Sequence, residues 1–227
     1  MINTINIDRL NCFNNTIYSF IDKKWLKEIN ILSNKYINDC KKINNKEIKQ
    51  RNQIYKKNVK DHGFVHHSKL LMQEPEFLEF QKYIGNISWD ILYDQGYDMN
   101  KYDMMIKDIW VQEFPLHGGG NHNTHIHQNS HISGFYFLKC SEKTSYPVFH
   151  DPRPGKMMTQ LLEKDSSKIT QVSEKLNYKP IPGTFLFFNS YMPHEFVVDN
   201  GIEPFRFIHF NLQAISKEIV NEKLKHV

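Results

Sequence analysis

The second half of the chain is a series of short apolar runs separated by turns. Residues 105–114 alternate apolar and polar side chains, and further runs follow at 132–138, 146–150, 184–188 and 205–212. Short runs with a period of two, bounded by Gly, Pro, Asn and Asp, are typical of β-strands. The sequence therefore predicts a mainly β core from residue 101 onward.

The first hundred residues have a different period. Apolar side chains recur at helical spacing over residues 17–36, and a second helix is expected from Pro75 to Gly96, because proline suits a first helical turn. The length of 227 residues fits one domain. We expect a single domain over 1–227, an α+β arrangement in which the mostly helical part, 1–100, packs on a β core at 101–215.

Composition excludes several classes of protein. Hydrophobic residues make up 40% and charged residues 24%, which indicates a globular chain. No apolar stretch is long enough to cross a membrane, and the first ten residues lack the pattern of a secretory signal. Three widely spaced cysteines do not suggest a disulfide framework. We therefore expect a cytoplasmic protein that does not contact membranes.

The net charge of +4 comes largely from residues 41–60, where eight Lys and Arg side chains accompany the single acid Glu47. Binding of single-stranded nucleic acid usually combines basic groups with aromatic side chains on which bases stack, and here only Tyr55 is aromatic. A solvated basic segment is the favoured interpretation, and we do not expect nucleic-acid binding.

Eight of the twelve histidines lie between His117 and His209. His125 and His127 are two residues apart, so on an extended strand their rings project from one face and can meet one transition-metal ion. This spacing alone is equally compatible with a polar turn. A second signal is the apolar run 183–188, which ends in a turn and delivers His194.

Arg206 stands alone among apolar and aromatic residues of the run 205–212, and such a position calls for an anionic partner. The Asp199-Asn200-Gly201 sequence is typical of a hairpin turn. If residues 195–198 pair with 205–212 through that turn, His194 and Arg206 share a face about 7 Å apart. A slip of one residue would turn Arg206 outward.

Taken in order, these segments resemble a family of Fe(II)/2-oxoglutarate oxygenases known from marine bacteria and their phages. The resemblance rests on the H-x-H pair, Ser133-Gly134-Phe135-Tyr136-Phe137-Leu138, residues 149–153, residues 183–194 and residues 206–211. It covers about 110–212 and is most specific toward its C-terminal end.

The resemblance implies a double-stranded β-helix, the cupin-like jelly roll, with iron at its open end. It implies His125, His127 and His194 as metal ligands, Arg206 as the anchor for 2-oxoglutarate, and Tyr136 as a second co-substrate contact if a bulge turns it inward. The implied activity is a dioxygenase, in particular a hydroxylase, that uses O2 and converts 2-oxoglutarate to succinate. The substrate would be a small molecule or a protein side chain, and a homodimer stays open.

Many 2-oxoglutarate oxygenases carry a carboxylate where this chain has His127. Either His127 binds the metal, or a water, Asp151 or Glu195 completes the site. Three other classes also remain open. They are a three-histidine cupin dioxygenase that does not use 2-oxoglutarate, a jelly-roll binding protein without catalysis, and a zinc hydrolase, for which we find no general base.

Overall fold

The structure is a computed structural model that describes residues 14–153 and 161–219. Its elements are, in chain order, β1 (Ile17–Ile21), α1 (Leu26–Ile54), β2 (His66–His67), η1 (Pro75–Phe77), α2 (Leu78–Asp94), η2 (Met99–Lys101), β3 (Tyr102–Glu113), β4 (His122–His125), β5 (Ile132–Lys139), β6 (Pro147–His150), β7 (Lys175–Asn177), β8 (Thr184–Asn189), β9 (His194–Phe196) and β10 (Arg206–Ser216).

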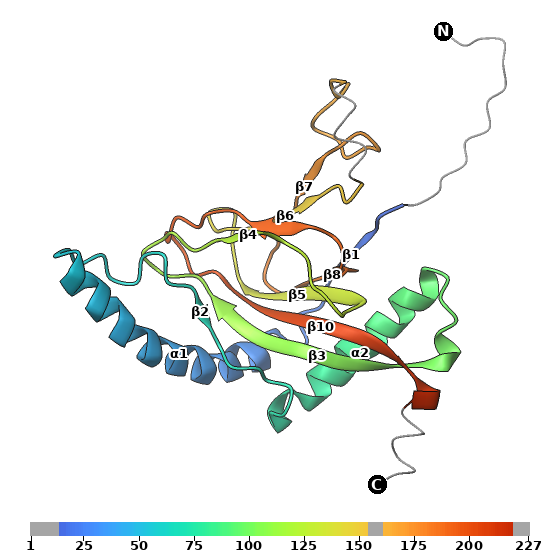
Figure 1. Cartoon of the computed structure of the whole chain (residues 1–227), viewed down its shortest axis with the longest axis horizontal. Coiled ribbons are helices and arrows are strands. Elements are labelled where there is room, and N and C mark those ends of the chain that lie inside the picture. The colour runs from blue at the N-terminus through green and yellow to red at the C-terminus, as the bar shows by residue number, and fades with distance from the viewer. Residues whose placement is uncertain (1–13, 154–160, 220–227) are drawn as a thin grey trace.

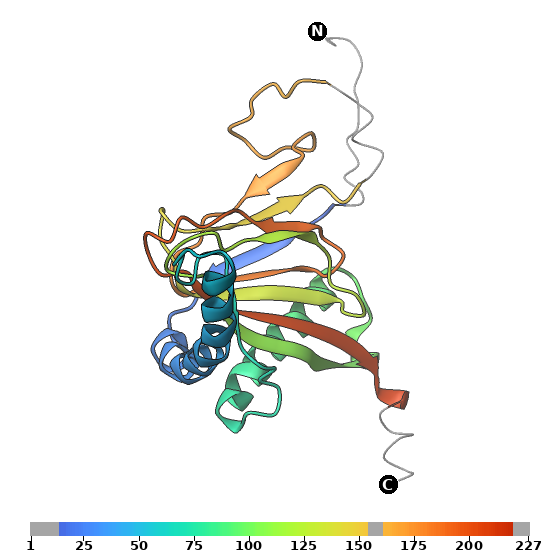
Figure 2. The same cartoon turned by 60° about the vertical axis from the view of Figure 1, so that its left-hand side comes forward.

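The strands form two antiparallel sheets. The larger sheet has the order β1-β8-β5-β10-β3-β2, and the smaller has the order β4-β9-β6-β7. The smaller sheet lies over one face of the larger, while α1 and α2 lie on the other side (Figures 1 and 2). This is the double-stranded β-helix, or jelly roll, that the resemblance implied.

Alternation along the central strands separates two apolar cores. Phe135, Phe137 and Phe207 point between the sheets, where they meet Phe149 and Phe196 of the smaller sheet. The intervening residues of the same strands point toward the helices, as the period of two requires; these include Tyr136, Leu138, Ile208 and Phe210. The larger sheet is therefore buried on both faces.

One glycine is required by this close packing. A Cβ added at Gly134 would overlap the ring of Phe210 and the carbonyl oxygen of Leu186. A side chain at this position of β5 would therefore push its neighbours apart.

The two helices pack against the sheet through one stripe each. Buried residues spaced three or four apart mark the stripe of each helix: Ile29, Ser33, Ile37 and Cys40 in α1, and Phe80, Ile84, Ser88 and Ile91 in α2. The helix expected from Pro75 is confirmed. Among the described residues, neither helix is apolar enough along its length to span a bilayer.

The helix predicted from residue 17 is wrong in its first turns. Residues 17–21 form β1, which pairs with β8 at the sheet edge, and the helix begins only at Leu26. Tyr18 and Phe20 pack on the helix side while Ile17 packs between the sheets. Apolar residues at 17, 20 and 21 fit either period, and the free sheet edge favours the strand.

The predicted hairpin around Gly201 is also wrong. The segments 194–196 and 206–216 belong to different sheets and face each other across the core instead of pairing edge to edge. Phe196 stacks on Phe207 with ring centroids 4.8 Å apart. The Asp199 carboxylate accepts hydrogen bonds from the backbone N–H groups of Gly201 and Ser145. These bonds hold the segment between β9 and β10 as a crossover from one sheet to the other.

Candidate metal centre

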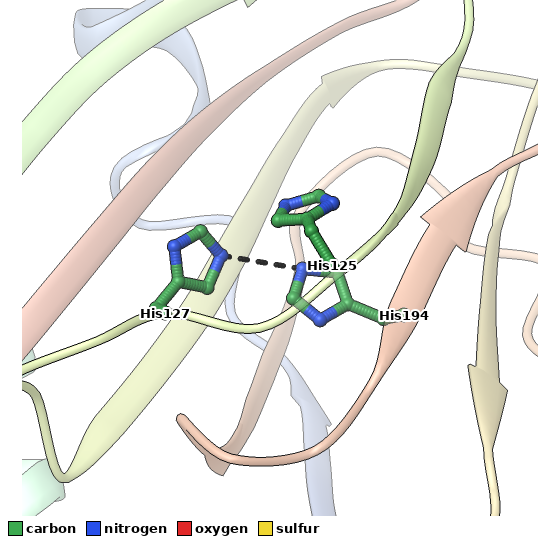
Figure 3. A group of neighbouring side chains, drawn as sticks. All are labelled: His125, His127 and His194. Carbon is green, nitrogen blue, oxygen red and sulfur yellow. Dashed lines mark hydrogen bonds between the residues drawn. The ribbon is translucent and has the colours of Figure 1, made fainter.

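Three histidines from two remote segments meet at one end of the space between the sheets. The ligand nitrogens of His125, His127 and His194 all lie within 4.8 Å of one another. The ring centroids of His125 and His194 are 4.4 Å apart, and Nε2 of His127 lies 3.3 Å from Nε2 of His194 (Figure 3). Metal–nitrogen bonds of about 2.1 Å at right angles place two ligand atoms roughly 3 Å apart, so this grouping suits one ion.

Strand pairing brings the rings together. His125 ends β4 and lies opposite His194, which begins β9. His127 follows β4, and its backbone N–H donates to the Ser190 carbonyl at 2.9 Å, which holds this segment beside the turn before β9. The predicted convergence of the three imidazoles is therefore present in the structure.

Two of the rings have their proton placed by the backbone. Nδ1 of His125 lies 2.7 Å from the Asn123 carbonyl oxygen, and Nδ1 of His194 lies 3.0 Å from that of Met192. A carbonyl oxygen only accepts, so each Nδ1 carries the hydrogen and donates it. The lone pair of each neutral ring is then on Nε2, as metal coordination requires.

Burial keeps His127 and His194 uncharged at neutral pH. It lowers the pKa of His127 to about 4 and of His194 to about 3, and neighbouring histidines add to both shifts. Phe135, Phe149 and Phe188 surround His194 with ring centroids 5.7, 5.9 and 4.8 Å away. Neutral imidazoles in an apolar wall are competent ligands for a divalent transition metal.

The inner face of β10 adds two polar side chains that the sequence-based prediction did not use as site residues. His209 is buried with its ring 4.5 Å from that of His127. Asn211, two residues on, places its side-chain nitrogen 3.5 Å from Nδ1 of His127. Both side chains lie on the face of β10 opposite Arg206.

A row of rings leads from His127 to the surface. His209 contacts Trp110, with centroids 4.2 Å apart, and Trp110 stacks on the exposed ring of His67 at 4.9 Å. Lys107 lies on the same side of the site; its ammonium group donates to the Gln128 carbonyl at 2.9 Å, and its charge helps to lower the pKa of His127.

Neither proposed carboxylate joins the histidines. Glu195 is on the opposite face of β9, where it accepts from Thr124 Oγ1 at 2.6 Å, and Asp151 pairs with Arg153 at 2.6 Å. Among residues 14–153 and 161–219, the metal-competent group of ligands consists of histidines alone.

Arg206 does not lie with the histidines. Its side chain points toward α1, where Nη2 is 2.5 Å from Glu113 and Nη1 donates to Ser33 Oγ and Asn34 Oδ1 at 2.8 and 2.7 Å. The predicted shared face with His194 is wrong, because Phe207 and His209 take the inner positions of β10. The anionic partner that Arg206 required is a side chain of this protein.

Tyr136 is likewise on the helix side of the larger sheet. Its hydroxyl donates to the Asp22 carbonyl at 2.9 Å, and its ring stacks on Phe185 with centroids 4.1 Å apart. The pairing of β5 with β8 is regular over residues 132–136, so no bulge there turns Tyr136 toward the histidines.

Comparison with known proteins agrees with this centre. Residues 108–211 match the family model described as "Putative 2OG-Fe(II) oxygenase". The matched segment is less than half of the chain, and it contains the whole smaller sheet and all three histidines. Over this segment the chain is similar to the 2OG-Fe(II) oxygenases, a class of oxidoreductases that use Fe(II) and 2-oxoglutarate. No curated protein matches the sequence.

Several solved structures are similar to this chain at low sequence identity. A Pseudomonas putida prolyl-4-hydroxylase is 10% identical with a TM-score of 0.49, covering 88% of this chain and 93% of that one. A Trichoplax adhaerens prolyl hydroxylase is 14% identical with a TM-score of 0.42, covering 84% and 93%. A Burkholderia pseudomallei 2OG-Fe(II) oxygenase family oxidoreductase is 11% identical with a TM-score of 0.37, and this chain spans 57% of its length.

Proposed function

We propose that this protein is a hydroxylase of the Fe(II)- and 2-oxoglutarate-dependent class, with His125, His127 and His194 as the iron ligands. Its substrate would be a small molecule or a side chain of another protein. The observation that carries the proposal is the convergence of three imidazoles, two of which have Nδ1–H held by a backbone carbonyl, so that Nε2 carries the lone pair.

The donor set fits Fe(II). Imidazole nitrogen is a ligand of intermediate softness that suits iron, and three neutral rings on one side of an ion leave its other positions open for ligands from solution. When bound, Fe(II) would supply O2 activation coupled to decarboxylation of 2-oxoglutarate to succinate and carbon dioxide. The phenylalanines around His194 would exclude water from the protein side of the ion.

The co-substrate needs a cation for its far carboxylate, and Arg206 is turned away from the site. Lys107 is the cationic side chain whose charge acts on His127. Its ammonium group donates one hydrogen bond, to the Gln128 carbonyl, within the part of the chain that the structure describes, which leaves two N–H donors for an anion. Lys107 is therefore our candidate for the carboxylate contact.

The test is an anaerobic titration of the protein with Fe(II) and then 2-oxoglutarate. We expect the weak visible charge-transfer band of the chelate to appear, and expect succinate to form when O2 is admitted. The His194→Ala variant should show neither signal. A wild-type protein that binds Fe(II) but forms succinate no faster than free Fe(II) would contradict the proposal. Oxidation of a substrate without 2-oxoglutarate would instead place the protein among the three-histidine dioxygenases.

A further inference from the structure

His127 differs from the other two rings in what holds its Nδ1. His125 and His194 face backbone carbonyls, whereas Nδ1 of His127 faces the side-chain amide of Asn211 at 3.5 Å. A carbonyl can only accept, but an amide can donate from one end and accept at the other. The tautomer of His127 therefore depends on which way this amide is turned.

In the orientation seen here, the amide nitrogen of Asn211 faces His127. Its oxygen accepts from Ser133 Oγ at 2.7 Å and lies 3.2 Å from Nε2 of His209. A donor facing Nδ1 makes that atom the acceptor, so the ring proton of neutral His127 is on Nε2. That N–H points at the Nε2 lone pair of His194, 3.3 Å away. This arrangement satisfies the rings, but it closes His127 Nε2 to a metal.

Turning the amide by half a turn produces the other arrangement. The oxygen of Asn211 then accepts Nδ1–H of His127, and its two N–H groups face Ser133 Oγ and His209 Nε2. The hydroxyl of Ser133 can then donate its hydrogen bond to Ser190 Oγ, 2.8 Å away. His209 becomes the acceptor at Nε2, so its single proton moves to Nδ1, a buried atom without a hydrogen-bond partner among the described residues. No proton is gained or lost.

We propose that Asn211 is a positioning residue of the metal centre: coordination through His127 requires its amide to be reversed, and the reversal moves the ring proton of His209 from Nε2 to Nδ1. This inference rests on the proposed metal site. It makes Ser133, Asn211 and His209 one hydrogen-bonded unit that has two states, and metal binding selects one of them.

Tautomers can be measured directly by NMR on protein with ¹⁵N-labelled histidine, using diamagnetic Zn(II) as the probe. His127 and His209 should both change from Nε2–H to Nδ1–H with one equivalent of Zn(II), while His194 should carry Nδ1–H throughout. Signals are assigned from the spectra of His127→Gln and His209→Gln. Zn(II) binding with an unchanged His209 tautomer would overturn the inference alone, and failure of Zn(II) to bind would overturn the metal site as well.

A variant pair separates positioning from packing. Asn211→Leu fills similar space but cannot accept Nδ1–H, so we expect Zn(II) affinity to fall about 10–100-fold. Asn211→Asp can accept in either orientation and should keep affinity within roughly threefold of wild type, since carboxylates often orient metal-bound histidines. Asn189→Leu, a like change outside this unit, should bind as wild type does. Equal losses in the Leu and Asp variants, or none in Leu, would overturn the assignment.

Discussion

Nε2 of His127 lies 3.3 Å from Nε2 of His194, although 67 residues separate the two in the chain. The contact depends on β4 and β9 being neighbours in the smaller sheet, and His125 is placed by the same pairing. One strand pair therefore assembles the whole ligand group, and changes in that pair should act on metal binding before they act on the rest of the fold.

Loss of one ligand gives the most direct prediction. His194→Ala should weaken Co(II) or Fe(II) binding by more than the roughly 10–100-fold typical of residues that only orient a ligand. Isothermal titration under anaerobic conditions measures this. The matched control is His131→Ala, which should bind metal normally. His131 belongs to the same histidine-rich stretch, but its Nδ1 accepts a hydrogen bond from the backbone N–H of Ala214. Equal affinities in both variants would remove His194 from the ligand set.

Arg206 should contribute to stability and not to metal binding. Burial alone would raise the pKa of Glu113, but Arg206 and Lys41 outweigh it and hold that pKa below its usual value. Arg206→Met leaves a buried carboxylate with Lys41 as its remaining cation, so we expect a loss of about 3 kcal/mol in the free energy of unfolding.

Urea denaturation measures the loss in the Arg206→Met variant, and Glu113→Gln should reduce stability in the same direction. Affinity for Co(II) should be unchanged in both. A variant of Arg206 that folds with full stability but no longer binds 2-oxoglutarate would restore the role that its sequence position suggested.

Lys107→Met tests the co-substrate contact. A charge-assisted hydrogen bond contributes about 1.5–3 kcal/mol, so the Kd for 2-oxoglutarate should rise roughly 10–100-fold while Fe(II) affinity stays the same. The chelate band, followed during a 2-oxoglutarate titration, reports both quantities. Lys217→Met, which removes an exposed lysine 3.7 Å from Asp103, serves as the control. An unchanged Kd in Lys107→Met would exclude this contact.

Acid should destabilise the metal-free protein. The pKa of His122 and of His127 is lowered, chiefly by burial, from 6.5 to about 4. Below pH 6.5 these two histidines bind protons in the unfolded chain, whereas in the folded protein they stay neutral down to about pH 4. The free energy of unfolding should therefore fall as pH decreases through this window, by up to about 1.4 kcal/mol per pH unit for each ring.

Denaturation in the presence of a chelator, repeated between pH 7 and pH 4, tests this pH dependence. His122→Gln should make the dependence of the free energy of unfolding on pH shallower, because one of the two histidines that bind a proton only on unfolding is removed. A stability that does not change over this range would mean that the rings are accessible to protons in the folded protein.

Much of this fold could be predicted from local patterns. The family resemblance adds His194 to the predicted metal site. The β core from Tyr102, the helix after Pro75 and the pair His125 and His127 follow from residue periodicity and spacing. These features depend on neighbours in sequence, where the alternation of side chains decides the face that each residue occupies.

The partner of Arg206 could not be predicted in this way. The turn chemistry at Gly201 is compatible with a hairpin or with a crossover, and only the packing of Phe196 on Phe207 decides between them. Once β9 and β10 face each other across the core, register arguments between them no longer apply. Glu113, Ser33 and Asn34, which surround the guanidinium, come from β3 and α1, and no short-range pattern links them to residue 206.

The two-sided character of β10 has a practical consequence for anyone who wishes to shorten this protein. A chain beginning at residue 101 would keep every histidine of the cluster, yet it would expose the aromatic underside of the larger sheet and strip Arg206 of its α1 partners. We expect such a fragment to aggregate when expressed alone, and a minimal active version of the enzyme should retain both helices.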